Sequence, residues 1–140
     1  MSSTECCIDE EVIAINKKLL VIAVVSISLL AYMFEYVRSK QVESSANNAM
    51  IIACKIGDAQ KVELLINAHV NTIGCRTDNG DTPLHIACRN NHDNIVNILI
   101  NHGADINSIN TSHETALHIS VQNRHYKCME ILLRRGISVN

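Results

Sequence analysis

The sequence contains seven histidines and six cysteines, residue types that often bind metals or act as bases and nucleophiles. His113 and His118 frame a segment similar to the zinc-protease motif, in which two histidines share one helical face at i and i+4. Here they are five residues apart, which turns the second about 140° around a helix. Thr115 is also expected to begin the helix, so His113 should lie outside it. We therefore predict neither a metal site nor a cofactor.

Four of the histidines recur at a fixed interval, because His85 and His118 are 33 residues apart, as are His92 and His125. A catalytic base has no reason to recur in this way, whereas a structural side chain in a repeat does. Cys128 lies close to His125 in the sequence, but we expect it on the inward face of a helix, where a thiol packs as a small apolar group. We therefore predict that the protein is not an enzyme.

The same interval relates many other positions between residues 77 and 140. Thr82 is suited to cap a helix, and Pro83 suits the first helical position because its missing N–H costs nothing there. Gly103 is expected to end the second helix in the left-handed conformation. The positions that define this motif are Thr82, Pro83, Leu84, His85, Gly103, Thr115, Leu117, His118 and Gly136.

This pattern resembles the ankyrin repeat, whose signature is a Thr-Pro-Leu-His-x-Ala core recurring at that period. The resemblance covers residues 46–140; Ala116 and Ser120 replace the proline and the alanine in the last repeat, and the first repeat matches weakly. It implies an all-α ankyrin solenoid of about three repeats, at 49–76, 77–109 and 110–140. The expected helices include 49–56, 59–67, 116–123 and 126–135.

An apolar segment precedes the repeats. Residues 19–34 form an uncharged run of 16 residues, which is borderline for a bilayer core that needs about 20 helical residues. Basic residues lie at both ends, and Tyr32 and Tyr36 lie at one end, where interfacial aromatic residues belong. We therefore divide the region into a polar acidic leader (1–18), a hydrophobic helix that spans the membrane (19–37) and a linker (38–48).

Two other interpretations of residues 19–34 stay open. One is a helix packed against the repeats, and the other is a cleaved signal peptide, for which the acidic leader is unsuited. The positive-inside rule gives almost a tie, but unpaired cysteines and the family resemblance favour cytosolic repeats. Asn110-Thr111-Ser112 is a glycosylation sequon that matters only in a lumen. Cys6 and Cys7 are candidates for S-acylation, although two exposed thiols are the simpler interpretation.

The expected function is binding of another protein. A net charge of −2 and the absence of tryptophan argue against nucleic acid, and no motif suggests a small-molecule substrate. In the ankyrin architecture the turn arms and first helices line a concave binding face. The residues expected there are Lys55, Ile56, Asp78, Asn79, Asp81, Arg89, Asn90, Thr111, Ser112, Glu114, Gln122 and Asn123.

The sequence is also similar to the short ankyrin proteins of large DNA viruses, particularly poxviruses, because Asn and Ile are abundant and the middle repeat is very regular. That resemblance implies modulation of host pathways, although the chain contains no F-box-like segment after the repeats. The alternatives are a soluble ankyrin inhibitor or decoy, with residues 19–34 packed on the repeats, and a remnant of a larger ankyrin protein.

Overall fold

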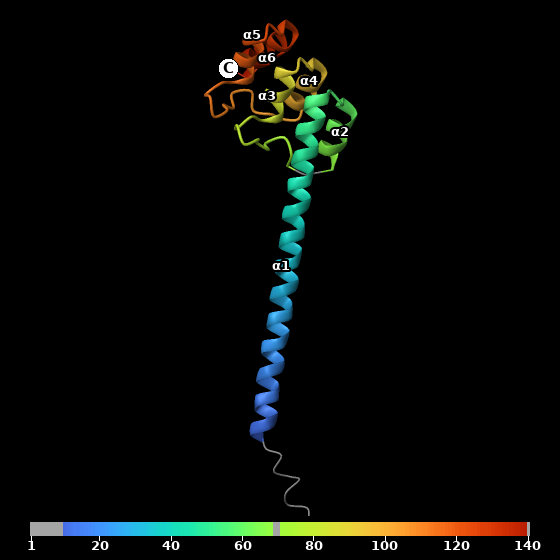
Figure 1. Ribbon diagram of the computed structural model, residues 1–140, viewed down its shortest axis with the longest axis vertical. Helices are drawn as coiled ribbons and strands as arrows, with labels where there is room; N and C mark the ends of the chain where they lie inside the picture. The colour runs from blue at the N-terminus through green and yellow to red at the C-terminus, as the bar shows by residue number, and fades with distance from the viewer. Residues whose placement is uncertain (1–9, 69–70, 140) are drawn as a thin grey trace, which may run out of the picture. The chain divides into compact units, whose positions relative to one another are not determined.

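The structure is a computed structural model that describes residues 10–68 and 71–139. This part of the chain contains six α-helices and no β-strand. The helices are α1 (Glu10–Ile56), α2 (Ala59–Asn67), α3 (Pro83–Arg89), α4 (Asp93–Asn101), α5 (Ala116–Gln122) and α6 (Tyr126–Val139) (Figure 1). The chain divides into two units, Met1–Gln41 and Val42–Asn140. The two candidate acylation sites, Cys6 and Cys7, lie outside the described residues.

The first unit contributes the apolar part of α1. By length and composition, α1 is the one helix among residues 10–68 and 71–139 that is apolar enough to cross a membrane. Its most apolar window of 18 residues has a mean hydropathy of 2.1 and buries none of its side chains. The hydroxyl groups of Ser26 and Ser28 donate to backbone carbonyls of the same helix, at 2.9 Å each. These two hydroxyl groups are therefore satisfied within the helix, as an apolar surrounding requires.

Residues 38–48 differ from the expected linker, because they are helical and continue α1 into the first repeat. Their sequence, Ser-Lys-Gln-Val-Glu-Ser-Ser-Ala-Asn-Asn from residue 39, contains neither proline nor glycine and therefore has no helix breaker. The Ser39 hydroxyl donates to the Tyr36 carbonyl at 2.9 Å, so its side chain is bonded within the same helix. The polar side chains of residues 38–48 therefore indicate that this part of α1 is mostly exposed, and they do not indicate a break in the helix.

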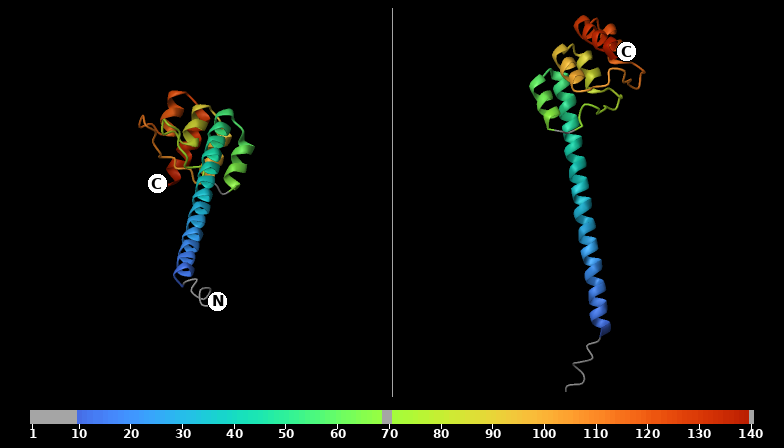
Figure 2. Two further views of the ribbon diagram at one scale, coloured as in Figure 1. Left: turned by 60° about the horizontal axis from the view of Figure 1, so that its bottom comes forward. Right: turned by 180° about the vertical axis from the view of Figure 1, so that it is seen from behind.

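The second unit is a stack of three helical pairs. The last part of α1 pairs with α2, α3 pairs with α4, and α5 pairs with α6, and the pairs follow one another in chain order (Figures 1 and 2). One continuous core runs through all three pairs. Its fully buried apolar side chains include Met50, Ala53, Cys54, Val62, Leu84, Ala87, Cys88, Ile95, Val96, Leu99, Ala116, Cys128 and Leu132. Each pair is too short to bury its own apolar face, so the neighbouring pairs complete the core.

Turn arms precede the second and third pairs and repeat their hydrogen bonds. In the second repeat the Thr77 N–H donates to the Asp81 carbonyl at 3.0 Å, and in the third the Asn110 N–H donates to the Glu114 carbonyl at 3.1 Å. The arms are joined because the Thr111 N–H donates to the Asn79 carbonyl at 3.1 Å. Sequential turn arms are therefore held together by their backbones, beside the helices.

Glycine ends α4 as expected but does not end α6. Gly103 has a φ of 89°, its N–H donates to the Ile100 carbonyl, and the next N–H, of Ala104, donates to the Leu99 carbonyl. This is the Schellman arrangement. At the equivalent position, Gly136 lies inside α6, so the expected helix end near residue 135 is wrong. Glycine permits the left-handed conformation without requiring it, and in repeat two the packing of Ala104 on the core selects it.

The turn within each pair requires one left-handed residue. Gly57 (φ 88°), Asn91 (φ 60°) and Arg124 (φ 58°) occupy this position in the three repeats. The conformation suits glycine and is tolerated by asparagine, but it costs other residues about 1–2 kcal/mol. Position 124 is therefore the strained member of the series.

We expect Arg124→Gly to stabilise the stack by about 0.5–1 kcal/mol, since relief of this strain exceeds the entropy cost of glycine in the unfolded chain. The measurement is the urea concentration at which the fully buried thiol of Cys88 becomes accessible to an alkylating reagent. Arg124→Ala removes the same side chain but keeps Cβ, and it should bring no gain. Equal gains in the two variants would show that the arginine side chain, and not the backbone, is responsible.

Candidate functional site on the inner face of the stack

The first helix of the second repeat begins with a hydrogen-bonded cap. Thr82 is extended (φ −83°, ψ 166°), and Pro83 is the first helical residue. The Thr82 N–H donates to Nδ1 of His85 at 3.2 Å, and the Thr82 hydroxyl lies 2.8 Å from the same nitrogen. Because an N–H can only donate, Nδ1 must be an acceptor. His85 is therefore the neutral tautomer that carries its proton on Nε2.

That proton joins two repeats, because Nε2 of His85 donates to the Glu114 carbonyl at 3.0 Å. The ring of His85 is completely buried, and burial lowers its pKa below the ordinary value. His118, the equivalent residue in the third repeat, makes the same contacts with Thr115, at 3.2 and 2.8 Å, but it is exposed. The two histidines thus share a capping role, and His85 adds a contact between repeats.

The second pair of recurring histidines also connects repeats. Nε2 of His92 lies 3.2 Å from the Lys55 carbonyl, and Nδ1 of His125 lies 2.8 Å from the Cys88 carbonyl. Each contact spans 37 residues and reaches the last turn of the preceding first helix. A Cβ atom on Gly57 would lie 2.7 Å from the His92 ring, so this ring packs closely on the preceding turn. These contacts explain the recurrence of the histidines as a structural requirement.

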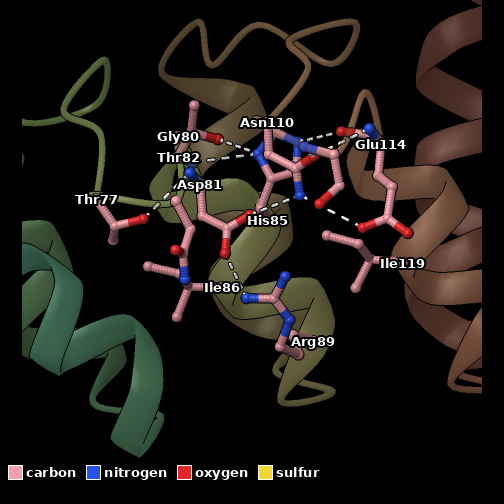
Figure 3. A network of polar contacts seen from close by, with 12 residues as sticks. Thr77, Gly80, Asp81, Thr82, His85, Ile86, Arg89, Asn110, Glu114 and Ile119 are labelled. Atoms are coloured by element: carbon pink, nitrogen blue, oxygen red, sulfur yellow. Dashed lines mark hydrogen bonds and ion pairs between the residues drawn. The ribbon is translucent and has the colours of Figure 1, made fainter.

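A buried carboxylate lies at the centre of the second repeat's polar contacts. Asp81 is 3 % exposed, forms an ion pair with Arg89 and accepts from Nδ2 of Asn110 at 2.9 Å (Figure 3). Burial would raise the pKa of Asp81, but hydrogen bonds from Arg89 and Asn110 outweigh it, and its pKa lies below the ordinary value. Asp81 therefore belongs to the framework, and it leaves the set predicted to face a partner.

The third repeat builds an equivalent pair with different residues. Gln122 donates from Nε2 to Oε1 of Glu114 at 2.7 Å. Nδ2 of Asn110 lies 3.4 Å from the other carboxylate oxygen of Glu114 (Figure 3). These hydrogen bonds, the one from Gln122 first, lower the pKa of Glu114. The pairs formed by Asp81 with Arg89 and by Glu114 with Gln122 each span eight residues, and Asn110 contacts both carboxylates. One polar network therefore extends over the second and third repeats.

Residues that the sequence did not single out complete this network. Arg76 donates to the Ile109 carbonyl at 2.8 Å, to the Ser108 hydroxyl at 2.8 Å and to the Gly80 carbonyl at 3.1 Å. Asn110 was considered for its sequon alone, although it holds both carboxylates. The separation of Arg76 and Ile109 by 33 residues, one repeat length, is the signal that could have indicated their contact.

We group the other predicted binding residues under one name, the inner face, by their equivalent positions in the repeats. It comprises the last turn of each first helix and the tips of the turn arms. Asn90 and Asn123 use their side chains to donate to the carbonyls of Ile86 and Ile119, at 2.8 and 2.9 Å. Glu114 is half-buried. The exposed members are Lys55, Ile56, Asp78, Asn79, Arg89, Asn90, Thr111, Ser112, Gln122 and Asn123.

The thiols of the stack are placed for packing. Cys54, Cys75, Cys88 and Cys128 are buried and unbridged. Burial raises the pKa of Cys54 to about 12, which makes it a poor nucleophile. Sγ of Cys128 lies 3.7 Å from Oδ1 of Asn91, while the nearby His125 ring is occupied by the Cys88 carbonyl. Within residues 10–68 and 71–139, no three His, Cys, Asp or Glu side chains gather as a metal site. Nothing in this arrangement indicates catalysis.

Comparison with known proteins gives the same architecture. The family described as "Ankyrin repeats (3 copies)" matches residues 20–110 and 50–140. Alpha-latrocrustotoxin-Lt1a of Latrodectus tredecimguttatus is 30% identical over 82 residues, which is 59% of this chain and 6% of the toxin. Ankyrin repeat domain-containing protein 40 of Mus musculus and of Homo sapiens is 36% identical over 62 residues, which is 44% of this chain and 17% of each relative.

The chain thus spans a small part of the length of these relatives, and the similarity concerns the repeats. Ankyrin repeats serve as modules that bind other proteins, and the capped helical pairs, the turn arms and the contacts between successive repeats are all present here. The chain belongs to the ankyrin repeat family.

Proposed function

We propose that this protein is a membrane-anchored module that binds another protein through the inner face of its ankyrin stack. The observation that carries the proposal is the inner face itself, a row of exposed polar side chains held by a hydrogen-bonded framework. A framework of this kind fixes the backbone under the contact residues, which reduces the ordering cost of binding. Modulation of host pathways, which the similarity to viral ankyrin proteins implies, stays a separate prediction that the proposed binding function does not require.

Anchoring is supported by the distance between the charges that flank the apolar run. Lys18 and Arg38 are separated by 20 helical steps, or about 30 Å, which equals the thickness of a bilayer's hydrocarbon core. Lys17 and Lys40 lie just outside them. Glu35 lies one turn from Arg38 at the same end, where long side chains reach the interface. A span between these basic pairs would leave the stack on one side of the membrane.

The buried state of Asn110 supports a cytosolic stack. Asn110 is the acceptor of the Asn110-Thr111-Ser112 sequon, and a glycan would attach to its Nδ2 atom. In the folded stack Nδ2 donates to Asp81, and the residue is 7 % exposed. A chain that entered the lumen would meet the glycosylation machinery before folding, and a sugar on Nδ2 could not be accommodated in the network. The fold is thus compatible with a cytosolic location of the repeats, where this modification does not occur.

Proximity labelling in cells tests the binding function. A biotin ligase is fused to the C-terminus, and labelled proteins are compared between the wild type and an Arg89→Ala/Asn90→Ala variant, with Gln60→Ala/Lys61→Ala on the exposed side of α2 as the matched control. Because Arg89→Ala removes the cation that pairs with buried Asp81, protection of Cys88 from alkylation must first show that each variant is folded. We then expect at least one abundant neighbour to be lost from the inner-face variant and retained in the control. If the inner-face variant labels the same proteins as the wild type, the inner face is not the binding surface.

A further inference from the structure

We propose that the first-repeat end of the inner face takes a peptide segment in which a carboxylate lies within a few residues of a large apolar side chain. This inference rests on the proposed function, because it names the chemistry of the partner for the same surface. It comes from comparing equivalent positions of the three repeats, which differ in character along the inner face.

The apolar part of this site is formed by Ile52 and Ile56 on α1. They are four residues apart, so they lie on the same face of the helix, and both are exposed. Ile52 is 53 % exposed, whereas its equivalent Ile86 is only 7 % exposed. The position of Ile56 is occupied by Asn90 in the second repeat. The inner face therefore changes from apolar at the first repeat to polar at the second.

The charged part is formed by Lys55 and Arg89, which occupy equivalent positions at the ends of successive first helices. The backbone carbonyl of Lys55 lies 3.2 Å from the His92 ring, which ties its turn to the second repeat. Neighbouring helices pack about 8–10 Å apart, so a carboxylate placed between the two cations is within reach of both long side chains.

The charges in this region are layered. Arg89 is exposed, and the carboxylate that pairs with it, on Asp81, is buried beneath it. Arginine has five N–H donors, and the ion pair with Asp81 is made through Nη1. An approaching segment therefore meets cationic side chains first at both positions, which favours a carboxylate in the partner.

The positions of these residues set the spacing within the partner. Lys55 lies three residues after Ile52 on α1, and side chains at this spacing are neighbours on a helix, so the carboxylate and the apolar side chain must lie close together on the partner as well. Beyond Arg89 the surface continues with Gln122 and Asn123, whose amides suit uncharged polar groups. The expected segment is thus apolar at one end, acidic next to it and polar farther on.

Selection from a random peptide library tests this inference. The full chain in detergent micelles is presented to phage that display random peptides of about twelve residues. We expect enrichment of sequences with Asp or Glu within four residues of Leu, Ile or Phe. Binding of a selected, fluorescently labelled peptide is then measured by fluorescence polarisation with the wild type and with three variants.

Lys55→Glu should weaken binding of the selected peptide at least 10-fold, and Ile56→Ser should weaken it about 5-fold. Lys61→Glu, an equivalent charge reversal on the exposed side of α2, should leave the affinity unchanged. Protection of Cys88 from alkylation shows in each case that the stack is folded.

Three outcomes would overturn the inference: no enriched peptide, enriched peptides without an acidic residue, or equal affinity of the wild type and Lys55→Glu. None of these outcomes would contradict the proposed binding function. That function is tested separately, because proximity labelling with the Arg89→Ala/Asn90→Ala variant does not depend on the chemistry of the partner.

Discussion

Two arginines in the middle of the apolar segment are expected to release the protein from membranes. Val25→Arg together with Leu29→Arg places both charges on one face of α1, near the centre of the apolar run. Each charge costs about 2.5–3.5 kcal/mol at the middle of an inserted helix. Together they oppose insertion by about 6 kcal/mol, a factor of about 10⁴. The measurement is the fraction of protein that stays with membranes after an alkaline carbonate wash.

The matched control adds the same two charges at the ends of the segment. Leu19→Arg and Tyr36→Arg lie beside the basic pairs, where an arginine side chain reaches the interface at little cost. This variant should remain with the membranes. If the wild type itself is washed off, residues 19–34 do not span a bilayer, and the soluble inhibitor with that segment packed on the repeats becomes the better description.

The same preparation tests the side of the membrane. A tag at the C-terminus should be digested by protease added to intact membranes, because we place the repeats in the cytosol. A protected tag that appears together with a glycosidase-sensitive mass shift, absent in Ser112→Ala, would contradict this placement. It would also mean that the contact between Asn110 and Asp81 does not form.

His85→Ala is expected to destabilise the stack by about 3 kcal/mol. The substitution removes a fully buried ring, leaves the Thr82 N–H without its acceptor and removes the donor to the Glu114 carbonyl. A buried group that loses its partner costs about 1–3 kcal/mol, and the cavity adds to this. His118→Ala is the matched control, because it deletes the same cap at an exposed position. It should cost about 1 kcal/mol or less.

The pH dependence of stability separates His85 from the control. The pKa of His85 lies below its ordinary value of 6.5, so the unfolded chain takes up a proton before the folded chain does. The stability provided by the neutral ring is complete above pH 6.5 and is lost as the pH falls toward the lowered pKa. We therefore expect the free energy of unfolding to fall as the pH is lowered from 7 to 5.5.

This loss should persist in His118→Ala and disappear in His85→Ala. The measurement is the urea midpoint for alkylation of Cys88, taken after the reagent's own pH dependence has been calibrated on the unfolded chain. An unchanged pH slope in His85→Ala would show that His85 is not the titrating group.

The sequence determined the repeat and the starts of the first helices in the second and third repeats. Thr82 and Pro83 favour the start of a helix at this point of the chain. Because similar residues recur after 33 positions, the same helical pair forms again, and successive pairs stack. Cys128 is predicted to pack on the inward face of a helix, and it is completely buried. These features depend on backbone chemistry and periodic apolarity, which are visible in a few neighbouring residues.

The sequence did not determine where α1 and α6 are continuous. The polar residues 38–48 suggested a linker, and Gly136 suggested a helix end, but both regions are helical. Neither polarity nor a single glycine breaks a helix, and whether the chain turns is decided by what packs after that point.

Only the tertiary structure decided which polar side chains of the inner face belong to its framework. Asp78, Asn79 and Asp81 are alike in a linear sequence, yet Asp81 is buried and paired while the other two are exposed. The difference arises because Asn110, from the next repeat, and Arg89, from the end of α3, converge on one carboxylate. Such convergence depends on the distance between repeats in space, and the order of residues along the chain does not contain that distance.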